Sequence, residues 1–170
     1  SQMEREFVYM EIVSGLSLRY LRLENASSPM LVTHLLQYAC ADSNALPPAL
    51  SAWQYAISQR LAQLPTLRQR LVESPLQLAN PLWLDDPHMD LNYHLRGVNL
   101  SETTTDNPQD LRSAPQNPDA FQVGLERLIA NRLANPLDRG SPLWRLDIVS
   151  SHESKQFAIL ATVHLALAYR

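Results

Sequence analysis

The sequence predicts a mixed α/β fold, of the two-layer α+β kind, in which a mixed sheet is packed by helices. Apolar residues recur at helical spacing in some stretches and follow the extended pattern of strands in others, and the two kinds of stretch are interspersed. Near the C-terminus, two extended runs flank a short polar segment, which is typical of an antiparallel hairpin. At least part of the sheet is therefore expected to be antiparallel.

Length and composition favour one domain, residues 1–170, with a sizeable core. Of the 170 residues, 45% are hydrophobic and 18% are charged, as in ordinary globular proteins. The net charge of −3 gives no basic footprint for nucleic acid. Cys40 is the single cysteine, which favours a reducing compartment, and no apolar run suits a signal peptide or a membrane span. We expect a cytoplasmic protein.

The first part of the chain predicts a short helix followed by a strand. Residues 14–24 carry leucines and a tyrosine at helical spacing, and Pro29 ends any helix before it. Residues 30–40 alternate as a strand does. We interpret His34, within this strand, as structural, because no second ligand-type residue lies near it in the sequence.

A longer helix is expected to begin near Pro48, since apolar residues recur at steps of three and four. These residues are Leu50, Trp53, Ile57, Leu61 and Leu64. Pro65 closes the helix, and residues 67–71 read as a short strand with Arg68 and Arg70 on one face. Two such arginines could hold an anion, but a solvated face is the favoured interpretation.

The middle of the chain predicts short extended pieces and a polar loop. Residues 81–86 read as a strand entering a turn, residues 89–95 as a further extended piece, and residues 98–118 as a surface loop. The densest set of potential metal ligands falls here: Asp85, Asp86, His88, Asp90 and His94. Their spacing matches no tight motif, so we expect no metal site.

The last part of the chain predicts a helix and then the hairpin. Asp119 is a plausible N-cap, and the apolar positions that follow share one helical face. These positions are Phe121, Leu125, Leu128, Ile129 and Leu133. A breaker-rich link spans residues 135–142, and residues 143–149 and 156–163 form the two extended runs.

His164 stands where the apolar run of the last strand ends. An imidazole titrates near neutral pH, so a histidine at the end of a buried strand is a candidate for chemistry. On the residues alone, a structural role is the favoured interpretation.

Several stretches, taken in order, carry a resemblance to a known family. They are SGLSLRYLRLE at 14–24, LPTLRQRLV at 64–72, PLWLDD at 81–86, DLNYHLR at 90–96 and NPLDRGSPLWRLDIV at 135–149. The chain resembles the N-terminal half of the wax ester synthase/diacylglycerol acyltransferase family, within the superfamily of chloramphenicol acetyltransferase and peptide-synthetase condensation domains. The resemblance implies a chloramphenicol acetyltransferase-like half whose C-terminal partner half is absent.

The same resemblance implies an activity and its partners. Such enzymes transfer a fatty acyl group from acyl-CoA, which is a substrate and not a bound cofactor, to diacylglycerol or a long-chain alcohol. Peripheral contact with a membrane or a lipid body is a further expectation. A non-catalytic remnant, a module that binds acyl chains or a partner, and a condensation-type domain are the alternatives.

The superfamily's catalytic motif, HHxxxDG, is degenerate in this sequence. Of the motif, His164 alone is retained, while Leu165, Tyr169 and Arg170 replace the second histidine, the aspartate and the glycine. The second histidine is the family's base, so the resemblance implies an inactive chain. Each of these three replacements requires only a single base change in the codon of the motif residue, which suggests a decayed or misread gene. Ser17 also departs from the family, which commonly has aspartate there.

The triplet Pro142-Leu143-Trp144 is a recurring family motif near the active-site channel. A proline that opens a strand and a tryptophan that fills a core explain it equally well. We favour the structural role.

Overall fold

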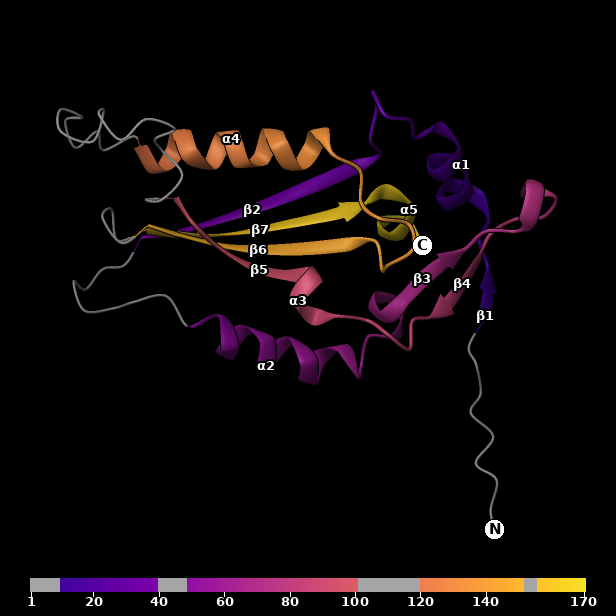
Figure 1. Ribbon diagram of the computed structural model, residues 1–170, viewed down its shortest axis with the longest axis horizontal. Coiled ribbons are helices and arrows are strands. Elements are labelled where there is room, and N and C mark those ends of the chain that lie inside the picture. The colour runs from indigo at the N-terminus through magenta and orange to yellow at the C-terminus, as the bar shows by residue number, and fades with distance from the viewer. Residues whose placement is uncertain (1–9, 40–48, 101–119, 152–155) are drawn as a thin grey trace, which may run out of the picture.

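The computed structural model describes residues 10–39, 49–100, 120–151 and 156–170 (Figure 1). The strands are β1 (Met10–Ile12), β2 (Leu31–Ala39), β3 (Gln69–Val72), β4 (Leu82–Asp85), β5 (Leu95–Asn99), β6 (Trp144–Ser151) and β7 (Gln156–His164). The α-helices are α1 (Gly15–Leu23), α2 (Leu50–Leu61), α3 (Leu91–His94), α4 (Ala120–Ala134) and α5 (Leu165–Ala168). The mixed α/β class predicted from the sequence is confirmed.

The strands form two sheets. The larger sheet has the order β2-β7-β6-β5, and the smaller has the order β1-β4-β3. β6 and β7 are antiparallel from the pair Trp144 and Val163 to the pair Ser151 and Gln156, which confirms the predicted hairpin. β5 runs parallel to β6, and α4 lies between them in the chain, as parallel strands require a crossover connection.

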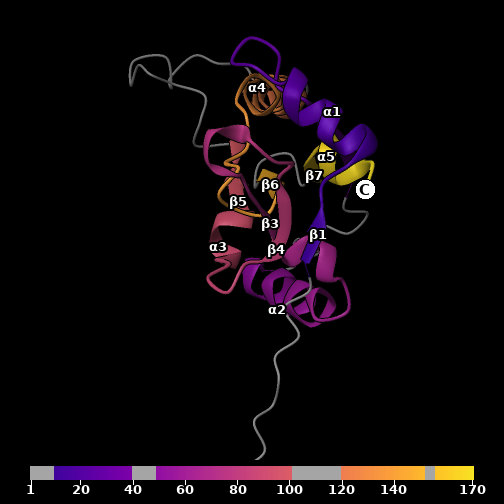
Figure 2. The same ribbon diagram turned by 90° about the vertical axis from the view of Figure 1, so that its right-hand side faces the viewer.

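Helix α4 covers one face of the larger sheet, and α2 lies on the opposite face (Figure 1); the end-on view in Figure 2 shows the same layering. Phe121 of α4 packs in a buried cluster with Val149 of β6 and Ala158 of β7. The Arg132 guanidinium donates two hydrogen bonds of 2.8 Å to Asp147, whose side chain is fully buried. Because a buried carboxylate needs a partner, this pair holds α4 on β6.

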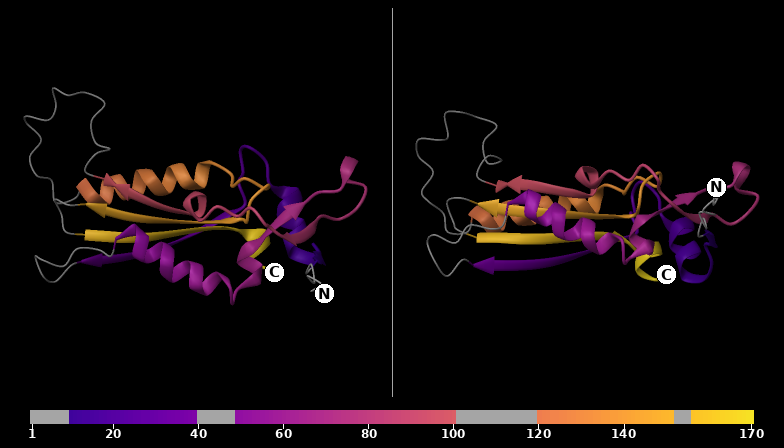
Figure 3. Two further views of the ribbon diagram at one scale, coloured as in Figure 1. Left: turned by 60° about the horizontal axis from the view of Figure 1, so that its bottom comes forward. Right: turned by 90° about the horizontal axis from the view of Figure 1, so that it is seen from below.

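Helix α2 covers its face of the sheet only in part. Seen from below (Figure 3, right), α2 runs over the middle of the larger sheet and leaves β2 uncovered at one edge. Leu36 and Tyr38 of β2 share this face with their partners on β7, and they are 53% and 45% exposed. The larger sheet therefore presents an apolar strip that the described residues leave open.

A second buried cluster joins the smaller sheet to the end of the larger one. Trp83 of β4 and Leu71 of β3 pack in it with Leu21 of α1 and with Leu143. The short helix α5, which follows β7 directly, contributes Ala166 and Leu167 to the same cluster. The end of β7, through α5, is thus packed against the smaller sheet and α1.

Most predicted elements are present, with shifted ends. The helix expected over residues 14–24 corresponds to α1, the strand expected over 30–40 to β2, and the strand expected over 81–86 to β4. Helix α2 ends at Leu61, a turn before Pro65. The strand expected over residues 67–71 is wrong at its start, because residues from Pro65 to Arg68 form a 3₁₀ turn and β3 begins only afterwards.

Two further predictions need correction, both near α3. Residues 89–95 are not extended throughout: the Asp90 side chain accepts a 2.9 Å hydrogen bond from the Asn92 amide and caps the helical turn α3. The polar loop begins later than residue 98, because Val98 and Asn99 belong to β5. The rest of that loop, the predicted N-cap Asp119, and most of the hairpin turn lie outside the described residues.

Among the described residues, no helix combines the length and the apolar character needed to cross a bilayer.

Candidate functional site

His164 is the last residue of β7 and the N-cap of α5. Its ring Nδ1 accepts a 2.9 Å hydrogen bond from the Ala166 backbone N–H, which would otherwise lack a partner at the start of the helix. Its own backbone N–H donates to the Leu143 carbonyl over 3.0 Å. The side chain is fully buried. Backbone groups on both sides therefore fix the position of this imidazole.

The other ring nitrogen of His164 faces Glu24. Nε2 lies 3.1 Å from Glu24 Oε1, although the ring N–H is not aligned with that oxygen as in a well-formed hydrogen bond. Because Nδ1 accepts a hydrogen bond, the neutral ring carries its own proton on Nε2. Burial lowers the pKa of His164, against the opposing attraction of Glu24. In this neutral ring, Nδ1 already accepts the Ala166 N–H and Nε2 carries the proton, so neither nitrogen is free to act as a base.

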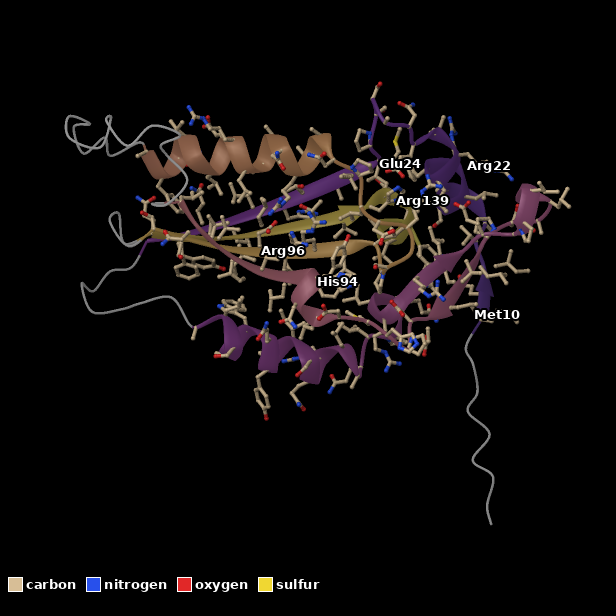
Figure 4. All side chains as sticks on the ribbon, in the orientation of Figure 1. Met10, Arg22, Glu24, His94, Arg96 and Arg139 are labelled. Atoms are coloured by element: carbon tan, nitrogen blue, oxygen red, sulfur yellow. The ribbon has the colours of Figure 1, made fainter. Side chains whose placement is uncertain are left out.

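Glu24, just after α1, is itself held by several donors (Figure 4). The Arg139 guanidinium donates to Glu24 Oε2 from Nε over 3.2 Å and from Nη2 over 3.0 Å, and the Met30 amide donates to Oε1. Arg139 also bonds Glu73, next to β3, over 3.0 Å. The network joins α1, β2, the smaller sheet and the link before β6 around His164.

Sequence reasoning did not single out Glu24 or Arg139. Both lie in stretches that carry the family resemblance, at the end of SGLSLRYLRLE and within NPLDRGSPLWRLDIV. The signal that could have found them is their charge, since each follows an apolar pattern and needs a partner once it is buried.

The residues at the other motif positions make structural contacts. Leu165 begins α5, and its amide donates to the Met30 carbonyl over 2.8 Å. The exposed Tyr169 ring lies 5.3 Å from the Tyr20 ring, centroid to centroid. These contacts attach α5 to α1 and to the start of β2.

Arg170 makes the most extensive of these contacts. It donates to Glu11 of β1 from Nε over 3.1 Å and from Nη2 over 2.6 Å. Its guanidinium carbon lies 4.9 Å from the centre of the Trp83 ring. The Arg170 side chain is 8% exposed, so it anchors the end of α5 to the smaller sheet.

Pro142, Leu143 and Trp144 are all buried at the start of β6. Trp144 Nε1 donates to the Leu67 carbonyl over 2.7 Å, and its ring stacks on His94 at 4.6 Å between centroids. His94 Nδ1 lies 2.7 Å from the Trp144 carbonyl, and burial lowers the pKa of His94. The triplet packs β6 against α3 and the residues before β3.

The other ligand-type residues are dispersed among structural roles. Asp86 accepts the His88 amide over 3.0 Å and lies 3.9 Å from Arg70, while Asp85 lies 3.6 Å from Arg68. The two arginines expected on one face of a strand therefore pair with neighbouring aspartates. In the described part of the chain, no three His, Cys, Asp or Glu side chains are grouped so that they could hold a metal ion.

A groove of about 250 Å³ lies between α2 and the open face of the larger sheet. Its walls are formed by apolar side chains of the helix and the strands, chiefly Ile57, Leu61, Leu64, Trp144, Ala161 and Val163. Val163 and Trp144 adjoin His164 and Leu143 in the chain, so the groove runs close to the end of β7.

Solved structures with a similar fold cover nearly the whole chain. The TM-score is 0.66 with the wax ester synthase/diacylglycerol acyltransferase from Marinobacter aquaeolei VT8, at 21% identity, over 92% of this chain and 33% of that one. It is 0.62 with the starter condensation domain of rhizomide synthetase RzmA, at 12% identity, over 93% and 34%. The fold is therefore the chloramphenicol acetyltransferase-like one that these proteins share.

The family model of the wax ester synthase/diacylglycerol acyltransferase catalytic domain matches residues 13–169. The chain belongs to this family. Among curated relatives, the probable diacylglycerol O-acyltransferase tgs3 of Mycobacterium tuberculosis is 34% identical over 148 residues, which are 87% of this chain and 48% of tgs3. For tgs1 of the same species, the identity is 32% over 71% of this chain and 23% of the relative. The chain thus spans about half of tgs3 and less of tgs1.

Proposed function

We propose that the chain is part of an O-acyltransferase of neutral-lipid synthesis, with acyl-CoA as donor and diacylglycerol or a long-chain alcohol as acceptor. Membership of the family and the names of its relatives support this proposal. The chain would act together with a second half of the fold, in peripheral contact with a membrane or lipid body, and without a bound cofactor.

We propose further that the chain, with its present sequence, does not catalyse this acyl transfer. In the reaction, the acceptor hydroxyl attacks the thioester carbonyl, a base takes the hydroxyl proton, the carbon–sulfur bond breaks and the CoA thiolate leaves with a proton. Leu165 stands where the family resemblance implies the base, and a leucine side chain accepts no proton.

The geometry of His164 is the observation that carries this proposal. Its Nδ1 is used by the Ala166 amide, its Nε2 faces Glu24, and the ring has no exposed surface. His164 therefore cannot substitute for the missing base without leaving α5 uncapped. The proposed role of His164 is to position the loop between β7 and α5.

A second candidate is a folded module that binds acyl chains or a partner without catalysis. The contacts of Arg170 favour it, because a residue that merely decayed from glycine would not be expected to form an ion pair with Glu11 and to lie on Trp83.

The test restores the base in the longest reading frame that contains this chain. Wild type, Leu165→His and Leu165→Ala are assayed with labelled palmitoyl-CoA and either hexadecanol or dioleoylglycerol. Because a positioned base contributes roughly 10²–10⁴-fold in rate, Leu165→His should exceed Leu165→Ala by about that factor. Equal rates for the two variants would show that position 165 is not where the base acts.

A further inference from the structure

A pocket of about 340 Å³ lies between the start of α1, the residues that follow α5 and the smaller sheet. Figure 1 and Figure 2 both show α1 beside α5 at this end of the molecule. Polar groups form much of its lining, chiefly from Glu11, Ser14, Gly15, Ser17 and Arg170, and Trp83 forms a further part. His164 and Leu165 are not among the described residues that line this pocket.

The start of α1 presents unused hydrogen-bond donors to the pocket. The backbone N–H groups in the first turn of a helix have no partner within the helix. Ser14 is the N-cap of α1, but its side chain caps none of them. Among the described residues, the N–H groups of Gly15, Leu16 and Ser17 donate to no other group. Together with the helix dipole, such donors act as about half a positive charge, and anions bind there.

Ser17 provides a second, independent indication of a ligand. The residue is 4% exposed, yet its hydroxyl forms no hydrogen bond with any residue that the structure describes. Side-chain hydroxyls buried to this extent normally have a partner. Its oxygen is not fully enclosed, and the pocket is the space that Ser17 lines, so the hydroxyl faces into it. A ligand in the pocket would supply the missing partner.

Arg170 adds a cation to the wall of the pocket. Glu11 accepts hydrogen bonds from its Nε and Nη2, whereas Nη1 is buried and has no partner in the described part of the chain. The Arg170 side chain is 8% exposed, and that of Glu11 is 44% exposed. Since Arg170 balances the charge of Glu11, the pocket keeps the partial positive charge of the helix end.

We propose that this pocket binds a phosphate group, carried by inorganic phosphate or by a small phosphomonoester that is not the acyl donor. The three N–H groups, the Ser17 hydroxyl and the Arg170 guanidinium suit the three or more oxygens of a phosphate better than the two oxygens of a carboxylate. The volume lies near the lower end for small-molecule sites, roughly 300–1,000 Å³, which limits the ligand to a small one.

The site is not one that the family resemblance implies. Ser17 and Arg170 stand at positions where the sequence departs from the family pattern, and the pocket depends on both. Binding of phosphate here requires neither a base at position 165 nor acyl transfer.

The test observes the proposed donors directly by amide NMR. The 170-residue chain is titrated with inorganic phosphate and with glycerol 1-phosphate at constant ionic strength, with chloride as the reference anion. The amide resonances of Gly15, Leu16 and Ser17 should shift and saturate with a Kd of about 1 mM or lower, while those of α4 stay in place. If only one of the two ligands saturates, that ligand identifies the source of the phosphate group.

Variants separate the pocket from the general effect of phosphate, which stabilises folded proteins because it is excluded from their surfaces. Ser17→Asp places a carboxylate among the donors and should weaken binding at least about tenfold, whereas Ser17→Ala should weaken it less. Glu11→Gln removes the acid that competes for Arg170 and should tighten binding. Arg19→Gln, at an exposed position of α1 outside the pocket, is the matched control and should bind as wild type does. Each variant is first checked by circular dichroism for a native fold.

The proposal is overturned if neither ligand produces saturable shifts at Gly15, Leu16 and Ser17, or if Ser17→Asp binds as tightly as wild type. Equal losses in Ser17→Asp and Arg19→Gln would also overturn it, because binding would then follow the overall charge of α1. Displacement of the bound ligand by coenzyme A would overturn it as well, because the pocket would then belong to the site of the acyl donor. None of these measurements involves acyl transfer, so failure here is separate from failure of the proposed function.

Discussion

His164 Nε2 lies 3.1 Å from the carboxylate of Glu24, and this buried contact joins the end of β7 to the end of α1. Arg139 neutralises Glu24 from the other side. The histidine that the family motif retains is therefore part of a structural network, and the proposed loss of catalysis rests on the adjacent residue, Leu165.

Replacement of His164 should reduce stability strongly. His164→Ala removes the cap of α5, worth about 1 kcal/mol, and leaves a cavity, so a total loss of about 2–3 kcal/mol is expected in urea unfolding. His164→Asn, which can still cap the helix, should lose less. His34→Ala, at an exposed position, is the matched control and should stay within about 0.5 kcal/mol of wild type. Equal losses for His164→Ala and His34→Ala would contradict the network.

Stability should fall as the pH drops below about 6.5. Burial lowers the pKa of both His164 and His94 in the folded chain, so below the unfolded pKa the unfolded state binds more protons. Each histidine contributes a slope of at most about 1.4 kcal/mol per pH unit, until the pH reaches its folded pKa. Urea midpoints between pH 8 and pH 5 measure this slope, and His164→Gln should make it shallower. A slope that is unchanged in His164→Gln would rule out His164 as a contributor.

Arg170 should stabilise the fold. Arg170→Gly, which restores the residue type of the family motif, removes the ion pair with Glu11 and the contact with Trp83, and should cost about 1–3 kcal/mol. A double-mutant cycle with Glu11→Gln should show a favourable coupling between the two side chains. If Arg170→Gly leaves the free energy of unfolding unchanged, the contacts of Arg170 no longer support the alternative of a folded, non-catalytic module.

Trp144 of β6 and Trp53 of α2 offer a matched pair. Trp144→Phe keeps the stacking on His94 but leaves the Leu67 carbonyl without its donor, at a cost of about 1–2 kcal/mol. Trp53 Nε1 is buried without a partner among the described residues, so Trp53→Phe should be neutral or slightly stabilising. Thermal unfolding of both variants measures the difference. If Trp53→Phe lowers the stability as much as Trp144→Phe does, the hydrogen bond from Trp144 to the Leu67 carbonyl does not account for the loss in Trp144→Phe.

Elements with a long, regular pattern could be predicted from the sequence, whereas short or locally capped ones could not. The apolar spacing from Leu50 to Leu61 and the two runs around the hairpin turn correspond to α2, β6 and β7. The helical turn α3 was missed because it depends on one side-chain cap, Asp90, within a stretch that alternates as a strand does. The parallel pairing of β5 with β6 depends on a crossover that no local pattern reveals.

In the candidate site, too, local sequence pattern predicted one part and missed the other. His164 could be found because an apolar strand leads directly to it. Its partners Glu24 and Arg139 come from other parts of the chain, and only the fold brings their charges to the end of β7. The family resemblance located the motif, and the structure shows that the retained histidine caps α5.

The most direct test of the account is acyl transfer by the chain itself. The purified 170-residue protein is incubated with labelled palmitoyl-CoA and hexadecanol or dioleoylglycerol, beside Leu165→Ala as the baseline. The account expects no wax ester or triacylglycerol above that baseline, because neither Leu165 nor the buried His164 can accept the hydroxyl proton. Product formation by the wild-type chain clearly above Leu165→Ala would contradict it.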